Sequence, residues 1–136
     1  MSANLSTVQQ IYASFGQGDV PGILEKLDDN VRWEDWADNS AQKAGIPWMQ
    51  LQHGKAGVLS FFQYLGSKFK ISDFQVLSMM DGGDKIAVEF VIEAELLASG
   101  KRYRDEEIHL WTFDGAGKVV GLRHYLDTHK HIEVSQ

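Results

Sequence analysis

The first half of the chain has the pattern of amphipathic helices. Apolar side chains recur every three or four residues from Leu5 to Phe15, which predicts a first helix with one apolar face. Two glycines follow, and Asp19 is then placed to cap a short second helix with Pro21 in its first turn. The same apolar spacing over residues 55–68 predicts a third helix.

The pattern changes between the second and third helices. Residues 31–36 predict a strand, whereas residues 37–54 contain glycine and proline and show no clear period. A connection of that length in so short a chain is commonly functional, as a lid or rim over a site.

The second half alternates between apolar and polar positions. Along residues 85–97, most apolar side chains face one way, and Glu89, Glu93 and Glu95 face the other. Turn sequences rich in glycine separate four predicted strands, which cover residues 70–80, 85–97, 102–114 and 119–128. Helices first and antiparallel strands last predict an α+β fold in which three helices cover one face of a curved sheet.

The composition narrows the functional classes. The 136 residues fit one domain spanning residues 1–136, and the lack of cysteine excludes disulfide and thiol chemistry. The 13 basic and 19 acidic residues give a net charge of −6 with no basic stripe, so we expect no nucleic-acid partner. The N-terminus lacks a signal peptide pattern, and no apolar run is long enough to span a membrane. We therefore expect a cytoplasmic protein with no membrane partner.

Several segments, in this order, resemble one superfamily. They are Gly18-Asp19 after the first helix, the strand 31–35, Gly54 before the third helix, the turn 113–119 and residues 123–128. Together they resemble the SnoaL-like and ketosteroid isomerase-like branch of the nuclear transport factor 2 superfamily over nearly the whole chain. The resemblance implies a cone-shaped domain that encloses a pocket. It leaves the activity open, because this fold serves isomerases, cyclases, epoxide hydrolases, dehydratases and binding domains.

Asp35 is the first candidate for chemistry. If the strand alternates, Trp33 and Asp35 point to one face while Arg32, Glu34 and Trp36 point to the other. The resemblance places Asp35 on the general-base aspartate of ketosteroid isomerase. A carboxylate beside an indole in a dry pocket has a raised pKa, which suits a base near neutral pH. The alternative is a solvated aspartate at the end of a strand.

His109 is the second candidate. It shares a strand face with Asp105, Glu107 and Trp111. The resemblance places it where the isomerase has a protonated aspartic acid that donates to the developing oxyanion. An imidazole can donate there, or carry a proton near neutral pH. The opposite face of this strand carries Ile108 and Leu110, so alternation alone also allows these two to be the buried residues and His109 to lie in water.

His124 is the third candidate, and the departures from the family patterns limit the reaction. SnoaL-like cyclases use a His and an Asp, but the residue two positions after His124 is Leu126. His124 is predicted to pair with His109 across neighbouring strands, as a catalytic group or as a histidine of the pocket wall.

The isomerase's tyrosine aligns with Ile11, and Tyr12 lies about 100° further around the helix. We therefore do not expect steroid isomerisation.

Epoxide hydrolysis and metal binding are also disfavoured. Limonene epoxide hydrolase resembles this chain but has an arginine and an aspartate where this chain has Phe90 and Ile92. His124, His129 and His131 form a histidine-rich tail, but this spacing without a fourth fixed ligand is a weak metal signal. We expect no metal and no cofactor.

The sequence thus predicts a cofactor-free isomerase, cyclase or lyase that moves protons on a small apolar or aromatic carbonyl compound. Asp35, His109 and His124 are the predicted catalytic residues. The predicted substrate contacts are Tyr12, Trp33, Phe90, Ile92, Asp105, Glu107, Trp111, Leu122 and Leu126. The alternative is a binding or assembly domain without turnover. Mixed charged and apolar residues on the outer sheet face predict a homodimer.

Overall fold

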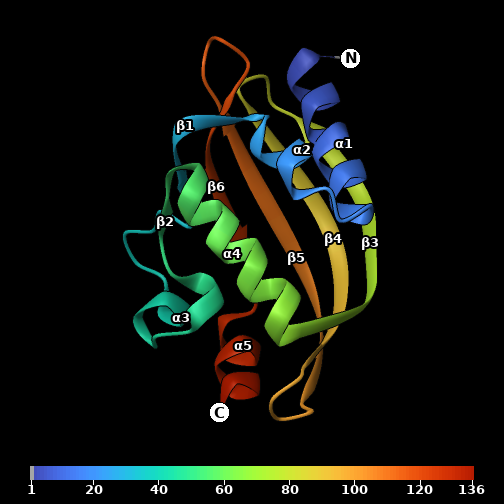
Figure 1. Ribbon diagram of the computed structural model, residues 1–136, viewed down its shortest axis with the longest axis vertical. Coiled ribbons are helices and arrows are strands. Elements are labelled where there is room, and N and C mark those ends of the chain that lie inside the picture. The colour runs from blue at the N-terminus through green and yellow to red at the C-terminus, as the bar shows by residue number, and fades with distance from the viewer. Residues whose placement is uncertain (1) are drawn as a thin grey trace.

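The sheet has six strands in the order β2-β1-β6-β5-β4-β3 (Figure 1). The computed structural model describes residues 2–136. The strands are β1 (Leu27–Trp33), β2 (Gln52–His53), β3 (Phe69–Asp81), β4 (Lys85–Leu96), β5 (Arg102–Phe113) and β6 (Val119–Tyr125). Neighbours pair antiparallel except β1 and β6, which run parallel.

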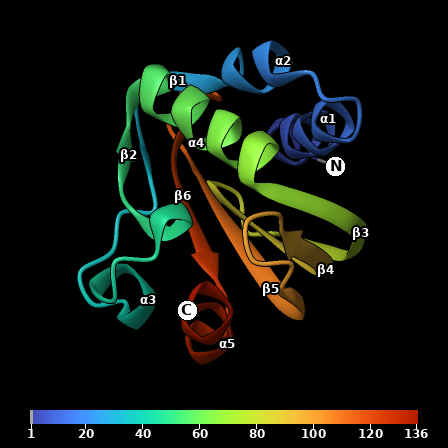
Figure 2. The same cartoon turned by 60° about the horizontal axis from the view of Figure 1, so that its bottom comes forward.

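Helices lie over one face of this curved sheet and at its lower end. They are α1 (Ala3–Gly16), α2 (Val20–Leu24), α3 (Ser40–Lys43), α4 (Gly54–Lys68) and α5 (Thr128–Ser135), with a short 3-10 helix η1 at Pro47–Met49. Figure 2 shows α1, α2 and α4 on the same side of the sheet, and α3 and α5 near the C-terminal end. None of the helices in residues 2–136 is long and apolar enough to cross a membrane.

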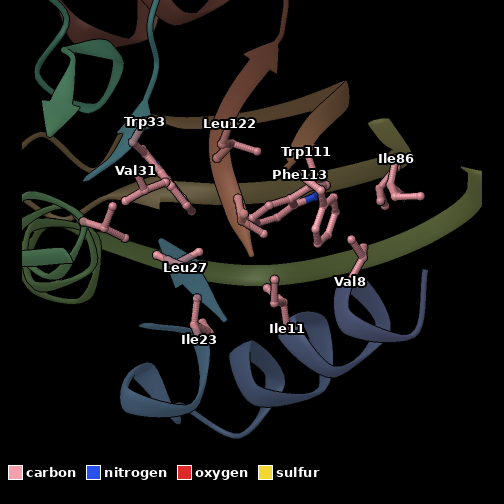
Figure 3. Close-up of a cluster of buried hydrophobic side chains, with 13 residues drawn as sticks. Val8, Ile11, Ile23, Leu27, Val31, Trp33, Ile86, Trp111, Phe113 and Leu122 are labelled. Atoms are coloured by element: carbon pink, nitrogen blue, oxygen red, sulfur yellow. The ribbon is translucent and has the colours of Figure 1, made fainter. Parts of the chain in front are cut away.

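Two apolar clusters fill the space between the helices and the sheet. The first joins α1, α2 and β1 to the upper part of β4, β5 and β6, and includes Val8, Trp33 and Trp111 (Figure 3). The second surrounds Trp48 and Phe90 and joins η1 and α5 to the middle of β4. The alternation of β4 positions Phe90 inward, because burial alternates along most of this strand. A cavity lined by residues of both clusters lies where the two clusters meet.

The predicted α+β fold is confirmed, with a correction to the helices. Residues 2–136 contain five α-helices where the sequence pattern predicted three. The additional ones are α3, which lies inside the long connection, and α5, which follows the last predicted strand in a tail for which no helix was predicted. Both are short, four and eight residues, so their apolar periodicity is too brief to detect.

Candidate functional site

An apolar cavity of about 70 Å³ lies between the helices and the inner sheet face. Aromatic side chains form most of its wall, and polar groups from β5, β6, α1 and α5 interrupt that wall at few points. These polar residues are Tyr12, Tyr103, Glu107, His109, His124 and His131. An apolar cavity with a few convergent polar groups is the usual form of a small-molecule site.

His109 lies at the cavity in contact with a hydroxyl group of α1. The Tyr12 Oη is 2.5 Å from His109 Nδ1, and the Trp111 Nε1–H donates to the same Oη at 3.1 Å. Because the Oη accepts from the indole, its own proton is free to be donated to His109 Nδ1. The neutral imidazole then carries its proton on Nε2.

Burial keeps His109 in this neutral form. The apolar surroundings lower the pKa of His109 well below its usual value, and the positive charge of His124 lowers it further. Burial also raises the pKa of Tyr12, so its hydroxyl keeps its proton. The Tyr12–His109 pair therefore presents an uncharged N–H donor.

His124 stands directly opposite His109 on the neighbouring strand. The two residues are register partners of β5 and β6, and their ring centroids are 4.4 Å apart. His124 Nε2 lies 2.8 Å from Glu107 Oε1. Both atoms are buried, and neither makes a hydrogen bond of suitable geometry. We therefore describe the contact as an ion pair.

This ion pair gives His124 the opposite electrostatic character from His109. Burial alone would lower the pKa of His124, but the negative charge of Glu107 outweighs it and the pKa is raised. Burial would likewise raise the pKa of Glu107, yet His124 and His131 hold it below its usual value. The favoured state is therefore a cationic His124 next to an anionic Glu107.

His131 closes the lower end of the cavity from helix α5. Its Nε2 lies 2.8 Å from Glu107 Oε2 and 3.1 Å from Asp105 Oδ2, and the Trp48 Nε1–H donates to its Nδ1 at 2.9 Å. Since Nδ1 accepts from the indole, Nε2 carries the proton that the two carboxylates share. Glu107 thus joins His124 to α5.

Asp105, Glu107 and His131 are close enough together to hold a metal ion. The hydrogen bonds argue for a different role. A histidine that binds a metal through Nε2 ordinarily donates an N–H from Nδ1 to a second group. Here Nδ1 accepts from Trp48 instead, and a fourth group, the Lys130 Nζ, lies 3.5 Å from Asp105. The arrangement fits a hydrogen-bonded network better than a metal site.

Glu34 is a buried carboxylate that the sequence pattern placed outside. Its side chain has no exposed surface, and its Oε1 lies 3.8 Å from His124 Nδ1 without a hydrogen-bond partner. The Trp36 Nε1–H donates to the other oxygen at 2.9 Å. Burial raises the pKa of Glu34 to about 7, although His124 and Trp36 act in the opposite direction.

Asp35 does not point into the cavity, so the predicted position of this residue is wrong. Its side chain is half exposed on the outer face and forms an ion pair with Arg32 at 2.7 Å, and this contact lowers the pKa of Asp35. The cause is local: β1 ends at Trp33, and Glu34 adopts a φ of 63°. This left-handed conformation breaks the alternation, so Glu34 turns inward and Asp35 turns outward.

Most of the other predicted residues lie where the sequence pattern placed them. The cavity wall includes Tyr12, Trp33, Phe90, Ile92, Glu107, His109, Trp111, Leu122 and His124. Asp105 is buried beside the wall, where its Oδ2 is hydrogen-bonded to His131 Nε2 and the Asp127 N–H. Leu126 packs against the second apolar cluster. Tyr12 does more than its helical position suggested, because its long side chain reaches His109 across the cavity.

The predicted site residues did not include His131, Glu34 or the cavity-wall residue Tyr103. His131 belongs to a helix whose start is signalled by Asp127, which caps α5 by accepting from the Lys130 N–H. That capping signal could have placed His131 on an ordered helix. No comparable signal precedes Glu34, because a left-handed glutamate is rare and is not announced by its neighbours.

The chain matches the family model of the SnoaL-like domain over residues 8–122. No curated protein sequence matches it. Among solved structures, an NTF2-like protein of unknown function from Burkholderia pseudomallei is 24% identical, with 98% of both chains covered and a TM-score of 0.80.

Two further structures carry functional descriptions. A Mesorhizobium loti protein, provisionally named a SnoaL-like polyketide cyclase, is 22% identical over 91% of this chain and 99% of its own, with a TM-score of 0.70. TerC, which was co-crystallised with polyporic acid, is 22% identical over 97% of this chain and 99% of its own, with a TM-score of 0.74. At these identities the likeness shows a shared fold.

Proposed function

The chain belongs to the SnoaL-like domain family of the nuclear transport factor 2-like superfamily, and from this premise we propose that it is a cofactor-free acid–base enzyme. Its substrate is a small, moderately apolar carbonyl compound, and the reaction is an isomerisation, cyclisation or elimination. One observation carries the proposal: two histidines side by side on the cavity wall have pKa values shifted in opposite directions. Such pairs mark the donor and acceptor positions of acid–base sites.

His109 binds the carbonyl oxygen in this proposal. Its Nε2–H is uncharged, is fixed in tautomer by Tyr12, and lies in a wall with little competing water. A donor of this kind gains strength when the oxygen becomes more negative, because the cavity is apolar and the group is already oriented. The contact therefore stabilises an enol or enolate more than the starting ketone.

His124 and Glu107 move the protons. His124 gives its proton to the substrate oxygen, while the proton on the neighbouring carbon passes to Glu107. Once His124 is neutral, burial dominates at Glu107 and raises its proton affinity, so the two transfers assist each other. In an isomerisation the enol proton then returns to His124 and the Glu107 proton goes to a different carbon, so no proton is gained or lost.

The neighbour TerC, crystallised with polyporic acid, supports a small-molecule ligand for this fold. A binding domain without turnover is the second candidate, favoured by the fact that Glu107, Asp105 and His131 also satisfy one another. We further expect a cytoplasmic homodimer formed through the outer sheet face. There Arg102 pairs with Glu95 and Arg104 with Glu93. Sedimentation that gives only a monomer would exclude the dimer.

Deuterium exchange at carbons next to a carbonyl tests the proposal directly. We expect the protein to speed the exchange of acetophenone, 2-tetralone or 3-cyclohexen-1-one in D2O, followed by proton NMR. His124→Asn should slow this exchange by 10²- to 10⁴-fold, the usual size of an acid–base contribution. His129→Asn is the matched control, since His129 lies exposed on α5. Ligand binding without exchange in the unmodified protein would favour the binding domain.

A further inference from the structure

The inner cavity is small for the ligands that its wall would recognise. Its volume is about 70 Å³. For comparison, an apolar cavity that binds benzene has a volume of about 150 Å³. A carbonyl group and a few carbon atoms fit near His109 and His124, so the remainder of a larger ligand has to lie elsewhere.

A second apolar depression adjoins the cavity on the helical side. It lies between the C-terminal end of α1, helix α2, the last turns of α4 and the start of β3, the helices that share one side of the sheet in Figure 1. Six residues belong to the walls of both spaces, namely Phe15, Ile23, Phe62, Leu65, Phe69 and Ile71. The two spaces therefore share a wall of apolar residues.

The lining of the depression is mostly apolar. Asp19 is the one ionisable residue in its wall, and its Oδ1 accepts the Gly22 N–H at the start of α2. Most of the open surface therefore suits a hydrocarbon group.

Gly66 keeps this surface open. It lies in the last turn of α4 in ordinary helical conformation, and a Cβ added there would meet no atom within 4 Å. Neither the backbone nor packing requires glycine, and most other residues favour a helix more than glycine does. Gly18 on the opposite side differs, because its φ of 69° itself favours glycine.

We propose that this depression, lined by Phe15, Phe62, Leu65 and Gly66, is an outer subsite for the apolar tail of the ligand. The ligand class is a carbonyl compound with a hydrocarbon chain or ring, whose polar end lies at His109 and His124. Its tail passes between the shared side chains and lies beside Gly66. This inference rests on the proposed function for the polar end only.

Methyl ketones of increasing length, from 2-butanone to 2-undecanone, test the subsite. Binding is followed by calorimetry and by the ring NMR signals of His109 and His124. Each buried methylene contributes about 0.8 kcal/mol, so we expect affinity to rise about fourfold per carbon. In Gly66→Trp the rise should stop once the chain leaves the inner cavity, while 2-butanone binds as before.

Two controls sit at the same place in the helix. Gly66→Ala adds a methyl group into free space and should follow the unmodified protein. Ser67→Trp adds the same bulk at an exposed neighbour outside the depression and should leave the length dependence intact. Affinity that does not rise with chain length, or that rises equally in Gly66→Trp, overturns the subsite.

Binding and turnover separate the two proposals. Affinity that rises with chain length, without any deuterium exchange, would support the outer subsite and refute the proposal that the protein is an enzyme. Exchange with affinity that is flat in chain length keeps the enzyme and refutes the subsite.

Discussion

His109 and His124 lie opposite each other on neighbouring strands, yet their surroundings give them different charges. His109 faces a tyrosine hydroxyl and an aromatic wall, and it stays neutral. His124 faces Glu107 and Glu34, and it is held in the cationic form. Two residues of one type, 4.4 Å apart, are thus assigned different chemical roles by the groups behind them.

Removing the charge of Glu107 should abolish this difference and have the largest effect. In Glu107→Gln, His124 loses its counter-ion, so burial lowers the pKa of His124 below its usual value. We expect the deuterium exchange to fall at least 100-fold. Breaking a buried ion pair also costs about 3–5 kcal/mol of unfolding free energy. NMR titration of His124 and urea unfolding measure the two effects.

Glu106→Gln is the matched control, because Glu106 lies exposed on the outer face of the same strand. An unchanged pKa of His124 in Glu107→Gln would show that the contrast has another origin.

The buried carboxylate Glu34 provides a second test of the comparison, through the pH dependence of the free energy of unfolding. The pKa of Glu34 is raised from 4.5 to about 7, so folding is favoured while Glu34 is protonated. This contribution to stability is lost as the pH rises from about 4.5 to 7. Glu34→Gln cannot ionise. We expect the free energy of unfolding of Glu34→Gln, relative to that of the unmodified protein, to increase by about 3 kcal/mol from pH 4 to pH 8.

Urea unfolding of both proteins at several pH values measures this difference. Glu25→Gln, at an exposed site, should show no such trend. A constant difference between Glu34→Gln and the unmodified protein at all pH values would mean that Glu34 is not a titrating group of the interior.

Tyr12 tests the neutral side of the pair. In Tyr12→Phe, His109 Nδ1 loses its donor and the Trp111 N–H loses its acceptor. We expect a loss of about 1–3 kcal/mol in unfolding free energy, because two buried polar groups are left without partners. Exchange should fall about tenfold, since His109 is no longer fixed in one tautomer.

Tyr125→Phe is the control for this change, because the Tyr125 side chain is 43% exposed. Equal stability of Tyr12→Phe and the unmodified protein would contradict the hydrogen-bond arrangement.

Asp35→Asn should have the smallest effect. The residue lies on the outer face, pairs only with Arg32 among the described side chains, and does not line the cavity. Surface ion pairs of this kind contribute little to stability. We expect exchange rates within twofold of the unmodified protein. A large loss of exchange would support Asp35 as a catalytic residue. It would also argue against the mechanism that rests on His109, His124 and Glu107.

The sequence by itself determined the parts of this protein that depend on local periodicity. The alternation along β4 placed Phe90 on the inner face, and the helical spacing placed Ile11 there. Along β5 the alternation put Glu107 and His109 on one face, and the family resemblance identified that face as the inner one. The resemblance of motifs predicted the family, which the family model confirms. These features follow from neighbours in the chain, so they can be recognised without the fold.

The tertiary structure decided what the local pattern could not. Strict alternation put Asp35 inside, but the left-handed backbone at Glu34 exchanged the two carboxylates, because β1 ends there and the chain turns toward α3. His131 became part of the site only because α5 docks against Trp48 and β5. Its position depends on contacts with residues 24 to 83 positions away, and the charge of His124 depends on the same long-range packing.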